Sequence, residues 1–250
     1  MRRNFRELLR EQSLLFGTLI SIPSLELAEI LANAGFDWFF IDLEHSVMGI
    51  REAQAIIQAV GDQVACVLRL PLNDEVWIKK ALDVGPSGII VPLVNSSEDA
   101  RRVVQCGRYP PAGHRSVGLG RASGYGANLQ QYLARANQET ALIVQAEHID
   151  AVNHIEEILN VDGLDGVLVG PYDLSASINR MGQVNDPEVR AAVEHVRKTC
   201  QALKMPVGIF AAGVEAAIQY RQEGYTLIAV GSDALLADRA ARELLSDWNH

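Results

Sequence analysis

The chain has 250 residues, of which 48% are hydrophobic and 21% charged, and its formal net charge is −9. This length suits one α/β barrel and the composition is that of an ordinary globular protein, so we expect a single domain over residues 1–250. Basic residues form no stripe or tail, and no apolar run is long enough to cross a bilayer, which argues against nucleic acid and membranes as partners.

The N-terminal residues MRRNFRELLREQ predict a short amphipathic helix with Phe5, Leu8 and Leu9 on one side, and they lack the apolar segment of a secretory signal. After this helix, short apolar segments alternate with longer amphipathic ones. Eight of the short segments are rich in Val, Ile or Phe, as strands covered on both faces are. They are Leu15–Ser21, Trp38–Glu44, Ala65–Leu70, Gly88–Val94, Ala141–Glu147, Gly166–Tyr172, Pro206–Ala211 and Thr226–Gly231.

The amphipathic segments between the strands predict eight helices, several of which end just before a glycine. They are Ser24–Ala34, Ile50–Ala59, Glu75–Asp83, Ser97–Gln105, Ala151–Leu159, Pro187–Leu203, Val214–Glu223 and Ser232–Leu245. Eight strands alternating with eight helices predict an α/β fold, a closed (β/α)8 TIM barrel. A doubly wound open sheet is the alternative, but no GxGxxG motif follows the first strand.

One connection, residues 107–131 (GRYPPAGHRSVGLGRASGYGANLQQ), is long and rich in Gly, Pro and Arg. Long loops of this kind are commonly functional or mobile. The other interpretation is a surface excursion or a contact within an oligomer.

The three cysteines, Cys66, Cys106 and Cys200, are odd in number and form no CxxC pair. We therefore expect neither a disulfide framework nor a thiolate zinc site. Reduced thiols in turn predict a cytoplasmic protein.

The active site of such a barrel lies where the strands end, and four predicted strands end in polar residues. The second ends Ile41-Asp42-Leu43-Glu44-His45, and the alternation of side chains places Asp42 and Glu44 on one side. Two carboxylates facing a barrel interior require a cationic partner or a metal. Histidine titrates near neutral pH, so His45 suits a general base, with a histidine hydrogen-bonded at a strand end as the alternative.

The third strand contains Arg69, whose charge does not fit a hydrophobic core. Arg69 could pair with Glu44 of the neighbouring strand, and it could hold a carboxylate or a developing enolate oxygen. The two roles are compatible, because the acid would orient the guanidinium toward the substrate.

The fifth and sixth strands carry the candidate metal ligands. Gln145 and Glu147 share a face of the fifth strand, and Asp173 follows Gly170-Pro171-Tyr172 at the end of the sixth. Two carboxylates on neighbouring strands, with positions left for water and substrate, suit Mg²⁺, Mn²⁺ or Co²⁺, and Zn²⁺ is a further candidate. Alternatively both acids cap helices, Asp173 as an N-cap, and free amides at that helix start would suit a substrate carboxylate.

Other sets of nucleophiles and ligands are not supported. His148 follows Glu147 directly and so points to the other side of the strand, and His114, His154 and His195 lie in loops or helices. No serine-nucleophile or P-loop motif is present. The four lysines fall in helical segments, which argues against a Schiff-base mechanism.

Taken in order, these strand ends resemble the HpcH/HpaI aldolase family, the metal-dependent pyruvate aldolases. The resemblance covers most of the chain, roughly from Phe16 to Leu245. Its matching segments are Phe16-Gly17-Thr18, Ser21-Ile22-Pro23-Ser24, Gly35-Phe36-Asp37, Ile41-Asp42-Leu43-Glu44-His45, Arg69, Gly88-Ile89-Ile90-Val91-Pro92, Tyr109-Pro110-Pro111, Gln145-Ala146-Glu147 and Gly170-Pro171-Tyr172-Asp173-Leu174-Ser175. Each segment alone is a weak signal, whereas the ordered set is a strong one.

The resemblance implies how the substrate and metal are bound. Glu147 and Asp173 would bind the divalent metal, with Gln145 beside it. Arg69 would hold the keto oxygen of pyruvate, and the pyruvate carboxylate would lie against backbone amides around Tyr172 and Asp173.

The implied activity is the reversible cleavage of 4-hydroxy-2-oxo acids to pyruvate and an aldehyde through a metal-stabilised enolate. His45 would act as acid and base through a metal-bound water. Asp83 would be its dyad partner, although the residues alone mark Asp83 only as a helix end. The family also implies homohexamers with sites near subunit boundaries.

Two positions depart from the family pattern and put the local loop shape in doubt. His148 stands where relatives usually carry a small hydroxyl residue, so it could touch the aldehyde, and Pro86 precedes the fourth strand.

Several alternatives stay open. Aldolases of the 2-dehydro-3-deoxyglucarate or 2-keto-3-deoxy-rhamnonate type differ only in the aldehyde. A metal-dependent decarboxylase or CoA-ester lyase on the same barrel would use the same enolate, but no adenine-binding surface is evident. A catalytically silent barrel that only binds a ligand is disfavoured by the complete set of acid, base, arginine and metal ligands.

Overall fold

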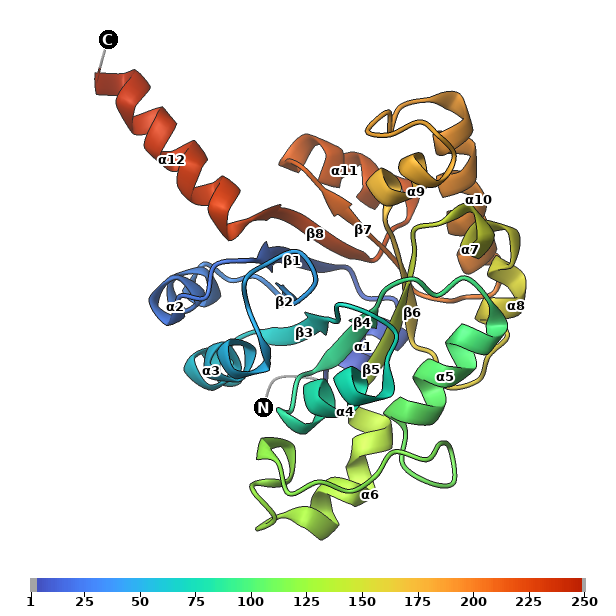
Figure 1. The fold of residues 1–250 in the computed structure, drawn as a ribbon. Helices are drawn as coiled ribbons and strands as arrows, with labels where there is room; N and C mark the ends of the chain where they lie inside the picture. The colour runs from blue at the N-terminus through green and yellow to red at the C-terminus, as the bar shows by residue number, and fades with distance from the viewer. Residues whose placement is uncertain (1–3, 249–250) are drawn as a thin grey trace.

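Eight parallel strands close into one barrel in the computed structural model, which describes residues 4–248 (Figure 1). Each strand pairs with its neighbours in chain order, and the last pairs with the first. The strands are β1 (Leu15–Ile20), β2 (Trp38–Asp42), β3 (Ala65–Arg69), β4 (Gly88–Val91), β5 (Ala141–Ala146), β6 (Gly166–Val169), β7 (Val207–Ala211) and β8 (Leu227–Ser232). The predicted (β/α)8 barrel is therefore confirmed.

Helices connect the strands and surround the barrel. Within the described residues they are α1 (Phe5–Arg10), α2 (Leu25–Asn33), α3 (Ile50–Val60), α4 (Glu75–Asp83), α5 (Ser97–Gly107), the 3-10 turn η1 (Arg121–Ser123), α6 (Leu129–Glu139), α7 (Ile149–Asn153), α8 (Ile155–Leu159), α9 (Pro171–Ser177), α10 (Pro187–Ala202), α11 (Val214–Glu223) and α12 (Asp233–Trp248). The single helix expected before β6 is two short ones, because the backbone leaves the helical conformation at His154. Helices α6 and α9 were not predicted, and α6 includes the end of the stretch 107–131.

Some strands end earlier than their apolar runs predict. Strand β4 ends at Val91, since the following Pro92 cannot donate a ladder hydrogen bond. Strand β6 ends at Val169, since Pro171 starts a helix. The polar residues that follow β2 and β6 therefore lie on a loop and on a helix at the C-terminal end of the barrel.

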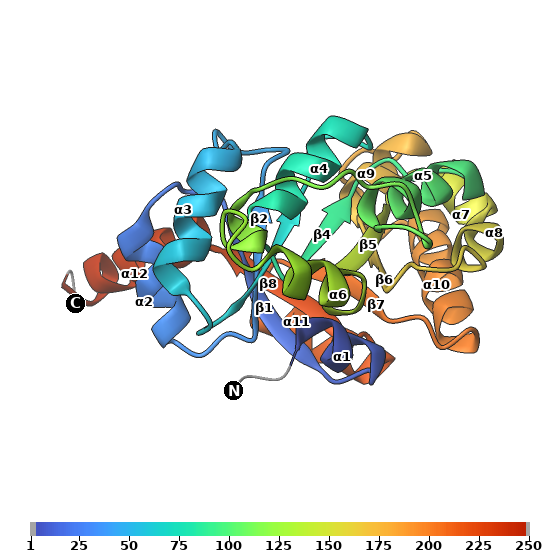
Figure 2. The same cartoon turned by 90° about the horizontal axis from the view of Figure 1, so that it is seen from below.

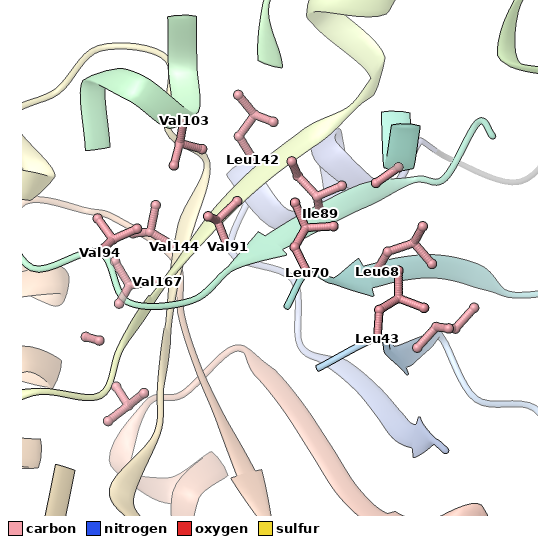
Figure 3. Close-up of a cluster of buried hydrophobic side chains, with 14 of the residues drawn as sticks. Leu43, Leu68, Leu70, Ile89, Val91, Val94, Val103, Leu142, Val144 and Val167 are labelled. Carbon is pink, nitrogen blue, oxygen red and sulfur yellow. The ribbon is translucent and has the colours of Figure 1, made fainter. Parts of the chain in front are cut away.

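Two buried hydrophobic clusters follow from the alternation of side chains along each strand. The inner cluster fills the barrel with one set of alternating side chains, such as those of Trp38, Phe40 and Val67. The outer cluster packs the opposite set against the helices. In Figure 3, Val103 of α5 lies on the same side of the sheet as Val144.

Helix α1 closes the N-terminal end of the barrel. Phe5 and Leu9 belong to the inner cluster, and the ring of Phe5 lies 6.3 Å from that of Trp38. The amphipathic helix expected at the N-terminus therefore forms, and its apolar side packs against the barrel interior.

Four charged residues, which we call the floor cluster, join α1 to this end of the barrel. They are Arg6, Arg10, Arg108 and Asp165. Asp165 Oδ1 accepts hydrogen bonds from Nε of Arg6 (2.7 Å) and of Arg10 (3.0 Å). Its Oδ2 accepts from Nη2 of Arg108 (2.6 Å) and from the amide of Leu142 (2.9 Å). Burial, with the nearby charge of Arg6, lowers the pKa of Arg108 to about 10, so the arginine stays charged at neutral pH.

Helix α12 projects away from the barrel on the side of α2 (Figures 1 and 2). Its apolar residues Leu235, Leu244, Leu245 and Trp248 are exposed, the last to 86%. No helix among residues 4–248 is long and apolar enough to cross a membrane. The single-domain and cytoplasmic expectations stay predictions.

Candidate active site

Polar side chains from β2, β3 and β5 meet inside the C-terminal end of the barrel. Asp42 and Arg69 are direct partners in the register of β2 and β3. Gln145 and Glu147 alternate with outward-facing residues and so continue the inner side of β5. All four are buried. Ionised groups in such a place need partners, and the C-terminal end of a barrel is where catalytic groups gather.

Arg69 is the centre of this group. Its Nε and Nη2 donate to Oδ1 (2.9 Å) and Oδ2 (2.8 Å) of Asp42, and its Nε lies 3.3 Å from Oε2 of Glu44. The guanidinium also lies 5.0 Å from the ring centre of Phe40. The predicted pairing with Glu44 exists, but Asp42 is the residue that orients the guanidinium, because the sheet register sets the two side chains opposite each other.

The Asp42–Arg69 pair stays ionised. Burial alone would raise the pKa of Asp42, but the hydrogen bonds and charge of Arg69 hold it below its usual range. Burial likewise disfavours the charge of Arg69, and Asp42 raises the pKa of the arginine above its ordinary value. The Nη1 of Arg69 makes no hydrogen bond within residues 4–248, so this N–H group can donate to a ligand.

Glu44 and His45 lie next to Arg69 at the mouth of the barrel. Burial raises the pKa of Glu44 to about 7; Arg69 opposes the shift and the charge of Glu147 adds to it. The Oε2 of Glu44 is buried without a hydrogen-bond partner in the described part of the chain. The Nε2 of His45 lies 3.8 Å from this oxygen, and the His45 side chain is 64% exposed. His45 is thus positioned to meet a ligand that enters the mouth.

Glu147 is held by two donors. Its Oε1 accepts from the amide of Leu93 (2.8 Å), and its Oε2 accepts from Nε2 of Gln145. Burial raises the pKa of Glu147, the two donors oppose this, and the charge of Asp173 adds to it. The Oε1 of Gln145 is buried and has no hydrogen-bond partner among residues 4–248.

Leu93 and Gly170 support Glu147 and were missed by sequence reasoning. Leu93 has a φ of 54°, a left-handed conformation that is rare for such a residue and that turns its amide toward Glu147. A Cβ on Gly170 would lie 3.0 Å from the Cβ of Glu147, so a larger residue there would push against the Glu147 side chain. The glycine was visible only as part of a matching segment, and no feature of the sequence marks the backbone conformation of Leu93.

Tyr172 and Asp173 lie on α9, not on a strand. The helix starts with Pro171 at its first position, its N-cap is Gly170, and Asp173 is the third residue. Asp173 is therefore not the N-cap, which was one of the two readings left open by the sequence. It is exposed, and its charge raises the pKa of Glu147, so the two carboxylates are electrostatically coupled.

The residues present fit a divalent metal. Glu147, Asp173 and the unpartnered Oε1 of Gln145 offer hard oxygen ligands, and a cation would relieve the repulsion between the two carboxylates. No group of three or more His, Cys, Asp or Glu residues that could hold a metal occurs in the described chain. An ion at this place would thus take its other ligands from the amide of Gln145, from water or from the substrate.

Asp83 does not join this group within one chain. It is the last residue of α4, and the segment after it leads to Ser87, whose amide bonds the carbonyl of Cys66 at the start of β3. Asp83 is therefore near the N-terminal end of the barrel, while His45 is at the C-terminal end. There Asp83 Oδ1 accepts from Nη2 of Arg115 (2.7 Å), so the expected pairing of Asp83 with His45 is not formed in the monomer.

The other histidine near the site has a structural partner. The Nδ1 of His148 accepts from the amide of Asp150 (3.2 Å) and caps α7. Its ring is held at the start of that helix, and the expectation that His148 is not a third ligand stays a prediction.

Known proteins that match this chain along its length belong to the family that the strand ends resemble. The profile of the HpcH/HpaI aldolase/citrate lyase family matches residues 14–240. The hydroxypyruvate/pyruvate aldolase of Sagittula stellata is 39% identical over 250 residues, which cover 99% of this chain and 98% of that protein. The 4-hydroxy-2-oxo-heptane-1,7-dioate aldolase of Klebsiella pneumoniae is 39% identical over 254 residues, covering 100% and 95%.

A solved structure of the same family has the same fold as this chain. The crystal structure of an HpcH/HpaI aldolase/citrate lyase family protein from Burkholderia cenocepacia matches with a TM-score of 0.94 and 34% identity over 98% of each chain. Matches of this length and identity carry both the fold and the reaction class. The chain belongs to the HpcH/HpaI aldolase/citrate lyase family and is a carbon–carbon lyase of the aldolase type.

Proposed function

We propose that the protein is a divalent-metal-dependent class II aldolase that reversibly cleaves 4-hydroxy-2-oxo acids to pyruvate and an aldehyde. One observation carries the proposal: within residues 4–248 a buried arginine, fixed by Asp42 and with no hydrogen bond at Nη1, interacts electrostatically with the buried Glu147, which in turn contacts Gln145 and its unpartnered Oε1. Such a place stabilises negative charge on a substrate oxygen. The names of the two relatives, for hydroxypyruvate and pyruvate and for a 4-hydroxy-2-oxo acid, support the substrate class.

Binding follows from the groups at the barrel mouth. Glu147 and Asp173 would hold the metal, with Gln145 beside it. A divalent ion there supplies positive charge that lowers the energy of an enolate. Arg69 donates from Nη1 to the keto oxygen, and the amides of Tyr172 and Asp173, in the first turn of α9, receive the substrate carboxylate.

The chemistry requires two proton transfers. In cleavage the C3–C4 bond breaks, the C4 hydroxyl loses its proton as the aldehyde forms, and C3 of the enolate gains a proton to give pyruvate. His45, exposed at the mouth, moves both protons through its Nε2. Arg69 holds the oxygen on which the negative charge develops between these two steps.

We further propose that the enzyme is a homo-oligomer, for which the family resemblance suggests a hexamer. Helix α12 leaves its apolar side chains in solvent when the chain is alone, and a second copy is the partner that would cover them. Asp83 and His45 lie at opposite ends of one barrel, and both side chains are partly exposed, at 34% and 64%. A dyad between them therefore requires Asp83 of a second copy.

The metal requirement is tested by coupling pyruvate release to lactate dehydrogenase. Protein stripped with a chelator is expected to lose cleavage of 4-hydroxy-2-oxo-heptane-1,7-dioate and to regain it with Mg²⁺, Mn²⁺ or Co²⁺. Glu147→Gln, which removes one ligand charge, is expected to show little recovery with any ion. Full activity in excess chelator would contradict the proposal.

The shared site is tested by mixing two inactive variants, His45→Asn and Asp83→Asn. If each site takes its histidine and its aspartate from different copies, co-refolded mixtures regain activity, because some sites receive both native residues. Mixtures as inactive as the separate variants would exclude a dyad between copies. Mass measurement of the native protein by light scattering gives the oligomeric state.

A further inference from the structure

The long stretch 107–131 packs its glycine-rich middle against the C-terminal end of α4. A Cβ on Gly118 would lie 2.6 Å from Oδ2 of Asp83, and a Cβ on Gly120 would lie 2.6 Å from the main-chain oxygen of Asp83. The stretch therefore follows Asp83 closely, and these two glycines place no side chain on its carboxylate.

Arg115, in the same stretch, is buried beside Asp83. Its Nη2 donates to Oδ1 of Asp83 (2.7 Å), and the side chains of Arg115 and Asp83 are 2% and 34% exposed. The Cζ of Arg115 lies 4.6 Å from the ring centre of Tyr109 and 5.8 Å from that of Tyr132. Aromatic rings at such distances attract a cation, and here they also limit its movement. Arg115 is therefore a fixed positive charge on the inner side of Asp83.

Asp83 is the anion that pairs with Arg115 within residues 4–248. Burial raises the pKa of Tyr109 to about 12; Arg115 opposes the shift, whereas Tyr132 and Asp83 add to it. Tyr109 thus stays neutral and contributes its ring, not a charge. The rings of Tyr109 and Tyr132 meet edge to face, with centres 6.1 Å apart. The two tyrosines hold the guanidinium in place, and the carboxylate of Asp83 balances its charge.

This pair leaves one carboxylate oxygen open, unlike the other buried arginine–carboxylate pairs. Both oxygens of Asp42 accept from Arg69, and both oxygens of Asp165 accept two hydrogen bonds each. Asp83 uses Oδ1 for Arg115, and its Oδ2 accepts no hydrogen bond within residues 4–248. An ion pair that only anchored a loop would be stronger with both oxygens engaged. The arrangement holds Asp83 and leaves Oδ2 for a donor from outside the chain.

We propose that Arg115 is a positioning residue of the aldolase, which holds Asp83 through Oδ1 so that Oδ2 can accept a hydrogen bond from His45 of a second copy. The inference rests on the dyad proposed above and adds the residue that sets its geometry. A carboxylate fixed in this way orients the imidazole that moves the protons. Arg115 acts through Asp83 and touches no substrate.

Mixing of variants separates a role through Asp83 from a general effect on the fold. Co-refolded Arg115→Gln and Asp83→Asn should gain no activity, because every Asp83 in the mixture is either badly held or replaced. Arg115→Gln mixed with His45→Asn should regain about a quarter of the native rate, since about a quarter of randomly formed sites combine a native His45 with an Asp83 held by Arg115. Damage to the barrel of the variant's own chain would give the opposite pattern.

Arg115→Gln alone is expected to lower kcat for pyruvate release about 10- to 100-fold and to change KM by less than about 2-fold, because the binding groups at the mouth are kept. Arg115→Lys keeps the charge and should lose less. Gly118→Ala keeps the arginine but places a methyl group against Oδ2 of Asp83. It should also lower kcat and follow the same mixing pattern, so it replaces Arg115→Gln if that variant does not fold.

Arg121→Gln is the matched control. Arg121 lies in the same stretch but donates to the main-chain carbonyl of Val84 (2.9 Å), so the variant should stay within about 2-fold of the native rate. Circular dichroism and light scattering check the fold and assembly of each variant.

Two results would overturn the inference alone: equal rates in Arg115→Gln and Arg121→Gln, or recovery when Arg115→Gln is mixed with Asp83→Asn. A third result is distinct. If His45→Asn and Asp83→Asn do not restore each other, the proposed dyad is rejected, and the role of Arg115 with it.

Discussion

Each end of the barrel contains a cluster of arginine and carboxylate side chains. The ratio of arginines to carboxylates is opposite at the two ends. The floor cluster at the N-terminal end has three arginines around one carboxylate, Asp165. At the C-terminal end three carboxylates surround a single arginine, Arg69. We call these four residues the mouth cluster. The mouth cluster consists of Asp42, Glu44, Arg69 and Glu147.

The two clusters differ in how far their polar atoms are satisfied. Both oxygens of Asp165 accept two hydrogen bonds each, and Nη1 and Nη2 of Arg108 also donate to the carbonyls of Thr140 and Gly163. The mouth leaves Oε2 of Glu44 and Oε1 of Gln145 without hydrogen-bond partners in the described chain, and burial raises the pKa of two of its acids. The floor is complete without a ligand, whereas the mouth is arranged for a cation and a substrate.

The sharpest test of this difference exchanges arginine for lysine at both ends. Arg69→Lys keeps the charge but cannot make the paired hydrogen bonds to Asp42, so kcat/KM for pyruvate release is expected to fall by about 10² to 10³. Arg10→Lys, on the half-exposed edge of the floor cluster, is expected to stay within about 2-fold of the native rate. Similar losses in both variants would mean that the mouth has no special role.

The reverse test removes the carboxylate of the floor. Asp165→Asn leaves three arginines around a neutral amide, and the free energy of unfolding is expected to fall by about 3 to 5 kcal/mol. Urea denaturation measures this loss. Protein that is still folded should keep its kcat/KM, and an unchanged stability would show that the floor cluster contributes nothing net.

The raised pKa of Glu44 predicts a pH effect at the mouth of metal-free protein. The unfolded chain loses this proton near 4.5 and the folded protein near 7, so native stability falls as pH rises through that window. The total loss is about 3 kcal/mol at most and is complete above pH 7. Glu44→Gln removes it, so the stability of the variant relative to the native protein should rise between pH 4.5 and 7. A constant difference over that range would refute the raised pKa.

The smallest expected effect concerns Leu93. Leu93→Gly relieves the left-handed backbone but frees the unfolded chain, so stability should change by no more than about 1 kcal/mol. Activity should stay within about 2-fold, since the amide that holds Glu147 is kept. Leu93→Pro removes that amide and is the contrasting variant, for which coupled pyruvate release should fall clearly below that of Leu93→Gly.

Local patterns were enough to predict the barrel and most of the mouth. The apolar runs with polar ends that contain Arg69 and Glu147 reflect burial on both faces of a strand, which a sequence shows directly. Whether Asp42 or Glu44 orients Arg69 depends on the register between two strands, which no single segment contains. The role of Leu93 depends on a backbone conformation that its side chain does not favour.

Connections were harder to predict than strands. An apolar run followed by Gly170-Pro171 was read as one strand through Tyr172, but the proline starts α9 there. Asp83 marks the limit of transferring roles along a sequence, because one barrel alone places it far from His45.

The amide of Leu93 has a consequence for how such an enzyme can change over time. Glu147 is held by the main chain at position 93, while the side chain of that residue is 53% exposed at the barrel mouth. A mutation can therefore change the side chain that residue 93 exposes to incoming aldehydes, and the hydrogen bond from its amide to Glu147 is kept. The new residue must tolerate the left-handed backbone conformation. At position 93 the backbone amide is needed to hold Glu147, whereas the side chain can change during evolution.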